Sequence, residues 1–214
     1  MPPLGMCTIT DIQPTRKGRY SIFLDGEFYC ALHVDIFATA HLRIQQVIAL
    51  ADIEEIRRRS ERKEAKDRAL RLLSQREYAS GHLRRKLLEY ADQEAADAAI
   101  ARMQELGLVD DYDYALRYTR DCYNLKGYSY IRAKQALLER GVPREIAQQA
   151  LEEVEYDAAA LILQLLHGRY ASRMQTPEND NKVAAALVRR GFSPGDVYRA
   201  MREFKEKRGL AAVD

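Results

Sequence analysis

The sequence predicts a mainly helical protein of tandem three-helix repeats, preceded by a small N-terminal β-hairpin segment. A Leu-x-x-Arg-Gly pattern at residues 137–141 recurs fifty residues later at 187–191, and a weaker copy lies fifty residues earlier at 87–91. Recurrence at one spacing is typical of helical repeat proteins, in which each unit buries its apolar face against its neighbour. The alternation of residues 19–32, by contrast, is typical of β-structure.

The hairpin is expected around the dipeptide Asp25-Gly26. Apolar residues alternate on both sides of it, at Tyr20, Ile22 and Leu24 and again at Phe28, Cys30 and Leu32. Asp-Gly between two alternating runs indicates a two-residue turn. A weaker strand near residues 8–13, ending at Pro14, is expected to join the hairpin, because two strands alone are marginally stable.

Helical periodicity begins at Val34. A short helix is expected over residues 34–40, and a longer one from Asp52, where Asp52 and Glu55 have capping-box spacing. The basic run Arg57-Arg58-Arg59 could contact phosphates, but the acidic residues that follow it favour a solvated helix face with alternating charges.

Each repeat is expected to hold three helices. The first helices begin near Asp67, Asp113 and Asp157, the second carry Leu87, Leu137 and Leu187 facing inward, and the third carry Ile100, Ala150 and Ala200. The predicted segments are 1–65 for the hairpin and linker helices, then 66–110, 111–155 and 156–214 for the three repeats.

Glycine and capping residues predict where these helices end and begin. Gly107, Gly141 and Gly191 are expected to supply left-handed residues at helix ends, with Leu108 packing back over the last turn. The next helices are expected to start at Asp92, at Asp110 or Asp111, at Pro143 and at Ser193, the last with Asp196 in a capping box.

Composition excludes several classes of protein. The 34 basic and 32 acidic residues leave a net charge of +2, which does not indicate a nucleic-acid binder. Three unpaired cysteines and no membrane-length apolar run predict a protein of the reducing cytoplasm. We also expect the protein to be a monomer. His33, His41, His82 and His167 are scattered, and no phosphate-binding glycine motif is present, so we expect no catalytic site, cofactor or metal.

Candidate binding residues follow from the repeat. Counting five residues back from each inward leucine gives His82, Arg132 and Lys182, which are expected to form an outward basic row. Arg140 and Arg190 are equivalent to each other and could bind a partner, or simply complement a helix C-terminus. Tyr128 and Tyr130 could be a stacking platform or packing residues, whereas Tyr114 and Tyr118 are expected to pack between repeats.

The order of several short fragments resembles that of the RecX family, the regulators of bacterial RecA recombinase. The fragments include Leu83-x-x-Lys86-Leu87, the run from Leu106 to Asp111, Lys126-Gly127 and Arg190-Gly191-Phe192. The N-terminal Leu24-Asp25-Gly26-Glu27-Phe28 matches as well, so the resemblance covers nearly the whole chain. One departure is Ala91, where the family usually has a helix-ending glycine.

The resemblance implies an elongated, curved array of three-helix repeats. It also implies a non-enzymatic partner of the RecA filament on single-stranded DNA, bound along its groove or at its end. Such a protein would restrain ATP hydrolysis, strand exchange and co-protease activity in recombination, DNA repair and the SOS response, with at most weak DNA contact of its own. The alternatives are a helix-turn-helix DNA-binding protein of transcription or chromosome organisation, and a generic helical scaffold. Near-neutral charge argues against the first of these.

Overall fold

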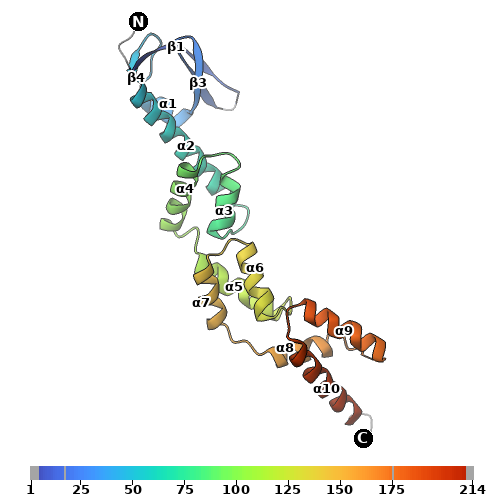
Figure 1. Cartoon of the computed structure of the whole chain (residues 1–214). Helices are drawn as coiled ribbons and strands as arrows, with labels where there is room; N and C mark the ends of the chain where they lie inside the picture. Colours follow the sequence, from blue (N-terminus) through green and yellow to red (C-terminus); the bar gives the residue numbers. More distant parts are fainter. Residues whose placement is uncertain (1–4, 17, 175, 211–214) are drawn as a thin grey trace. The chain divides into compact units, whose positions relative to one another are not determined.

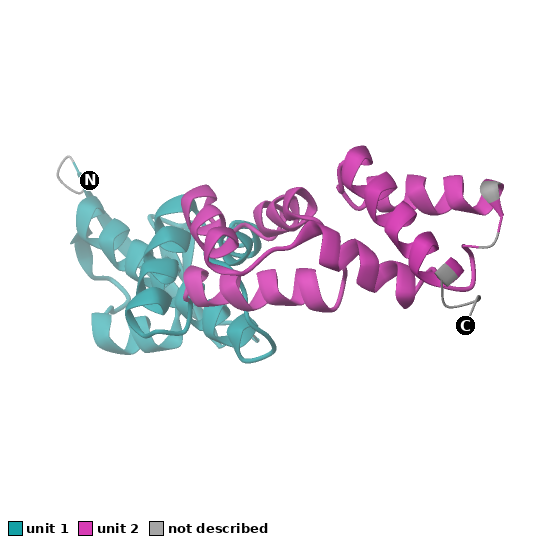
Figure 2. Cartoon of the chain, turned by 90° about the horizontal axis from the view of Figure 1, so that it is seen from below, with its two compact units in different colours: residues 1–109 teal, residues 110–214 magenta. Residues whose placement is uncertain are grey.

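The computed structural model describes residues 5–16, 18–174 and 176–210. The chain forms two compact units, Met1–Val109 and Asp110–Asp214, coloured separately in Figure 2. The division lies one residue before a boundary expected from the sequence. The four-segment division itself stays a prediction.

The N-terminal sheet is larger than the expected hairpin. Its strands are β1 (Met6–Pro14), β2 (Arg19–Leu24), β3 (Glu27–His33) and β4 (Val47–Ala49), in the antiparallel order β3-β2-β1-β4 (Figure 1). The turn at Asp25-Gly26 is confirmed, with φ of 49° and 94° at these two residues. Strand β4 was not expected. It pairs Cys7 with Ile48 across 41 residues of sequence, so local alternation does not reveal it.

Two helices follow this sheet. Helix α1 (Val34–Ala40) has the expected bounds. Helix α2 (Leu50–Leu73) begins before Asp52, because β4 continues directly into it, and its N-cap Ala49 has no side-chain hydrogen bond. The expected capping role of Asp52 is therefore wrong. The helix expected to begin near Asp67 is the last part of α2.

Helices α3 (Ser80–Leu87) and α4 (Gln93–Glu105) pack on the C-terminal half of α2. Their shared core contains Leu83, Leu87 and Met103, all at most 1% exposed. Asp92 caps α4 as expected, since its carboxylate accepts the Ala95 N–H at 2.8 Å. Ala91 does not enter the left-handed region, unlike Gly141 and Gly191 at φ of 80° and 88°.

In the connection between the two units, the residue that packs back over α4 differs from the expected one. Gly107 is left-handed as expected, with φ of 67°, but Leu108 is 48% exposed. Val109, at 4%, is the residue that packs back, and its amide bonds the Met103 carbonyl at 3.3 Å. Asp110 then caps the next helix through the Tyr112 and Asp113 amides.

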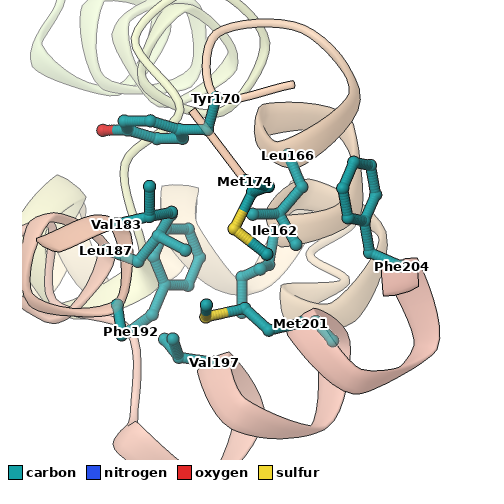
Figure 3. Close-up of a cluster of buried hydrophobic side chains, with 12 residues drawn as sticks. Ile162, Leu166, Tyr170, Met174, Val183, Leu187, Phe192, Val197, Met201 and Phe204 are labelled. Atoms are coloured by element: carbon teal, nitrogen blue, oxygen red, sulfur yellow. The ribbon is translucent and has the colours of Figure 1, made fainter. Parts of the chain in front are cut away.

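The second unit contains six helices among its described residues. They are α5 (Asp111–Asn124), α6 (Tyr130–Glu139), α7 (Arg144–Glu153), α8 (Ala158–His167), α9 (Pro177–Arg189) and α10 (Pro194–Leu210). Leu137 and Leu187 are fully buried, as the repeat predicts. Figure 3 shows the core around Leu187, where side chains from α8, α9 and α10 meet. Ser193 caps α10 by accepting the Asp196 N–H at 3.1 Å, which confirms the expected cap. The Asp196 carboxylate accepts from the Ser193 hydroxyl at 2.7 Å, in place of the Ser193 N–H that a capping box would use.

Within the described ranges, no helix has the length and apolar character needed to cross a membrane.

Candidate partner-binding surface

Two tyrosines of α5 form the base of a surface in the second unit. Tyr114 and Tyr118 lie one helical turn apart, so their rings fall on the same face. The rings stack with centroids 6.1 Å apart and an interplanar angle of 10°. Both side chains are half-buried, and they pack within one three-helix group. The residue that bonds the Tyr114 hydroxyl comes from the end of the neighbouring α6, and the expectation that the two tyrosines pack between repeats stays a prediction.

Two cations cover these rings. The Arg140 guanidinium carbon lies 4.3 Å from the Tyr118 ring centroid, and its Nη1 donates to the Tyr114 hydroxyl at 3.2 Å. The Lys126 Nζ lies 3.8 Å from the centroid of the same Tyr118 ring. A cation over an aromatic face is attracted by the ring quadrupole. Tyr118 therefore holds two positive charges in fixed positions.

The arrangement continues through the next tyrosine. The Tyr128 ring centroid lies 5.9 Å from Lys126 Nζ and 5.5 Å from the Arg132 guanidinium carbon. We call the resulting set the cation–tyrosine ladder. It consists of Tyr114, Tyr118, Lys126, Tyr128, Arg132 and Arg140.

A tight turn between α5 and α6 brings these residues together. Gly127 takes φ of 59°, which reverses the chain right after α5, and the Tyr128 amide bonds back to the Cys122 carbonyl at 2.8 Å. Ser129 then starts α6, because its Oγ accepts the Arg132 N–H at 3.2 Å. The turn thus places Tyr128 next to Lys126, and Arg132 next to Tyr128.

The ladder gathers three cations, Lys126, Arg132 and Arg140, on one surface. Arg132 lies 3.3 Å from the Glu139 carboxylate, whereas the contacts described above for Lys126 and Arg140 are with tyrosines. On α9 and α10 of the same unit, Lys182, Lys205 and Lys207 each lie beside a carboxylate, as Lys207 does beside Glu203.

Arg190 adds a fourth cation, which contacts the turn between α5 and α6 at residues 125–129. We call this segment the ladder turn. The Arg190 guanidinium donates to the backbone carbonyls of Lys126 and of Gly127, the latter at 3.3 Å. It therefore complements the end of α5 and not the end of its own helix, which was the simpler expectation from sequence.

Four of the seven candidate residues thus lie together: Tyr128, Arg132, Arg140 and, behind the turn, Arg190. The other three lie elsewhere. Lys182 is 69% exposed, pairs with Glu178 at 2.7 Å, and borders a hollow of about 360 Å³ on α9. The Tyr130 hydroxyl accepts from Gln148 at 2.8 Å and its ring lies 6.1 Å from Tyr156, whereas His82 contacts Tyr78 in the first unit.

Sequence reasoning did not identify Lys126, and it assigned Tyr114 and Tyr118 to packing. The signal for all three is the density of tyrosines, since six of the chain's 13 fall between positions 112 and 130. Lys126-Gly127 in the middle of that stretch marks the turn that brings them together.

Cys122 lies on α5 next to the residues of the ladder. Burial raises the pKa of its thiol, although Lys126 and Arg140 act in the opposite direction, so the group is held as a thiol. Among the residues that the structure describes, no cluster of histidine, cysteine and carboxylate side chains could hold a metal ion.

Comparison with known proteins covers both units. The family model described as "RecX, second three-helix domain" matches residues 110–151, which include the ladder. The regulatory protein RecX of Thermus thermophilus is 33% identical over 139 residues, 65% of this chain and 91% of that protein. RecX of Listeria monocytogenes is 25% identical over 196 residues, 87% of this chain and 71% of the relative. A crystal structure of a regulatory protein RecX aligns with a TM-score of 0.61 at 25% identity, over 92% of this chain and 99% of the other.

Proposed function

Because the chain belongs to the RecX family of non-enzymatic regulatory proteins, we propose that it binds RecA filaments on single-stranded DNA and inhibits them. The inhibited activities are ATP hydrolysis, strand exchange and co-protease activity. The partner and the cytoplasmic site of action come from the family resemblance. Three free, buried cysteines are consistent with that reducing compartment.

The cation–tyrosine ladder is the observation from which we propose which residues contact the filament. Lys126, Arg132 and Arg140 are held on aromatic rings, so they lose little additional side-chain entropy when a partner binds. Arginine and tyrosine are also the residue types enriched at energetically important interface positions. The ladder is therefore the proposed contact for a negatively charged face of the filament.

The remaining candidates, His82, Tyr130 and Lys182, stay predictions that lie outside this surface. Lys182 already has a carboxylate partner in Glu178, so a contact through it would compete with that ion pair. Exposed pairs of this kind contribute little to stability and are readily exchanged.

The test uses the wild-type protein and RecA from the same organism. Hydrolysis of ATP by RecA on single-stranded DNA is measured as the protein is added, and binding of the protein alone to the same DNA is measured in parallel. Inhibition at concentrations that give no DNA binding supports the proposal. Tight DNA binding with unchanged RecA activity would select the helix-turn-helix DNA-binding alternative instead.

Filament position is tested by the stoichiometry of that inhibition. A protein that lies along the groove inhibits in proportion to the number of RecA subunits it covers. A protein that caps the end inhibits growing filaments at far lower ratios and leaves preformed filaments hydrolysing ATP. The ratio at which inhibition saturates, together with the response of preformed filaments, decides between the two positions.

A further inference from the structure

The turn between α9 and α10 is joined to the ladder turn at two places. On one side, the Arg190 guanidinium donates to the carbonyls of Lys126 and Gly127. On the other side, the Ser129 N–H donates to the Arg190 carbonyl at 3.2 Å. The backbone segment that carries Lys126, Tyr128 and Arg132 is thus bonded to Arg190 before and after Tyr128.

Two glycines allow this close approach. Gly191 has φ of 88°, and a Cβ there would overlap Ser129 Oγ and lie 3.4 Å from Arg132 Cβ. Gly127 lies against α8, because a Cβ there would be 2.7 Å from Leu165 Cδ2. The helices α8, α9 and α10 therefore reach the ladder turn through both Leu165 and the Arg190-Gly191 pair.

Arg140 and Arg190 occupy equivalent positions in the repeat but use their guanidinium groups differently. Arg140 lies on the Tyr118 face and is part of the ladder. Arg190 is turned onto backbone carbonyls, and its Nη1 donates to both the Lys126 and the Gly127 carbonyl. Nη1 stands at the end of a rigid, planar guanidinium, whereas the lysine ammonium ends a flexible stem that is one bond shorter, so a lysine at this position does not place its donor at the same point.

We propose that Arg190 is a positioning residue that fixes the ladder turn in its binding geometry, and that the α8–α10 helices control the partner surface of α5 and α6 through it. The proposal rests on the proposed function for its binding consequence, but the structural coupling is independent of the partner. Arg190 acts on the partner only by holding Lys126, Tyr128 and Arg132 in place.

Amide hydrogen exchange in the full-length protein tests the coupling without RecA. The variants are Arg190→Ala and Arg190→Lys, with Arg189→Ala as the matched control, because Arg189 is exposed on the same turn of α9. Both Arg190 variants are expected to speed exchange of the Tyr128 and Ser129 amides roughly tenfold, since charge-assisted bonds that close the turn are lost. Arg189→Ala should leave both amides at the wild-type rate. Unchanged protection in Arg190→Ala would overturn the proposal.

Inhibition of RecA separates positioning from direct contact. Arg190→Lys keeps the charge, so a direct contact predicts retained inhibition, whereas a positioning role predicts the same loss as Arg190→Ala. A second comparison makes Arg190→Ala in a protein that already carries Lys126→Gln. If Arg190 acts by positioning Lys126, the further loss of RecA inhibition is much smaller there than the loss that Arg190→Ala causes in the wild type. Equal losses in both backgrounds would contradict the proposal. If the wild type fails to inhibit RecA, the function proposal fails, while the exchange measurement still decides the coupling.

Discussion

Lys126 and Tyr118 face each other across the end of α5, with the lysine Nζ 3.8 Å from the ring centroid. The two residues are eight positions apart, and the backbone at the end of α5 holds the lysine near the ring, because the Lys126 amide bonds back to the Asp121 carbonyl at 3.1 Å. A lysine held on a ring keeps its charge at a fixed point on the surface. Complementary charges at fixed points favour both fast association and a defined orientation of the partner.

The Lys126–Tyr118 contact should be measurable in the free protein. A double-mutant cycle with Lys126→Met and Tyr118→Leu is expected to give a coupling free energy of about 0.5–1 kcal/mol, as for partly exposed cation–π pairs. Tyr118→Phe keeps the ring and serves as the control, for which the coupling should persist. Additive effects of Lys126→Met and Tyr118→Leu on urea unfolding would mean that the pair does not interact in solution.

Alanine substitutions at Gly191 and Gly107 separate the cost of a steric clash from the cost of backbone strain. Both have positive φ, at 88° and 67°, but only Gly191 faces atoms of another helix, whereas Gly107 faces open space. Gly107→Ala should cost about 1 kcal/mol from strain alone, and Gly191→Ala should cost more, on the order of 2–3 kcal/mol. Unfolding free energies of the two variants provide the measurement. Equal costs would show that the α9–α10 turn does not press on Ser129 as described.

The first unit should lose stability in acid through Glu54. A hydrogen bond from Arg57, followed by one from the Tyr29 hydroxyl, lowers the pKa of the Glu54 carboxyl from 4.5 to about 2. Because the folded-state pKa is the lower one, this stabilisation is present above about pH 4.5 and is lost as the pH falls towards 2. Tyr29→Phe removes one of the two bonds, so the loss between pH 7 and pH 3 should be smaller than in the wild type.

Tyr20→Phe is the control for this pH dependence, since Tyr20 stacks on Phe37 in the same sheet region. Amide exchange of β3 between pH 7 and pH 3 reports the first unit alone, once the intrinsic dependence of exchange on pH is corrected. A pH dependence in Tyr29→Phe as steep as that of the wild type would rule out the hydroxyl as a contributor.

The cysteines should be unreactive while the protein is folded. Burial raises the pKa of the Cys30 thiol to about 12, and it also raises the pKa of Cys7 and of Cys122. At pH 8 a thiol with a pKa near 12 is ionised in about one molecule in ten thousand, and only the thiolate reacts. Iodoacetamide at pH 8 should therefore label the native protein slowly and all three cysteines quickly in urea. Rapid labelling of Cys30 in the native state would contradict its burial.

Local signals in the sequence predict much of this fold. The Asp25-Gly26 turn and the caps at Asp92, Asp110 and Ser193 follow from side-chain and backbone chemistry within four residues, and the structure confirms them. The inward leucines follow from helical periodicity. Strand β4 and the true start of α2 do not, because pairing with β1 decides both and that partner is some forty residues away.

The ladder could be predicted only in part for the same reason. The repeat predicts Arg132 and Arg140 as candidates, and the neighbouring glycine predicts Tyr128. No local pattern indicates that Arg140 and Lys126 both contact Tyr118, or that Lys126 and Arg132 both lie near Tyr128. Their meeting depends on the turn at Gly127 and on the packing of α6 against α5. Lys182, in the position equivalent to Arg132, lies on α9 next to Glu178 and has no tyrosine to hold it.

The most direct test of the account is inhibition of RecA by a ladder variant. Lys126→Gln with Arg140→Gln removes two charges from the ladder, and the control variant, Arg189→Gln with Arg202→Gln, removes two exposed charges from α9 and α10 of the same unit. ATP hydrolysis by RecA on single-stranded DNA is measured against increasing concentrations of each protein, at low and at moderate salt. The ladder variant is expected to need roughly tenfold more protein for half-inhibition, with the larger difference at low salt, while the control variant inhibits like the wild type. Wild-type inhibition by a folded ladder variant, or an equal loss in the control variant, would contradict the assignment of this surface to the partner.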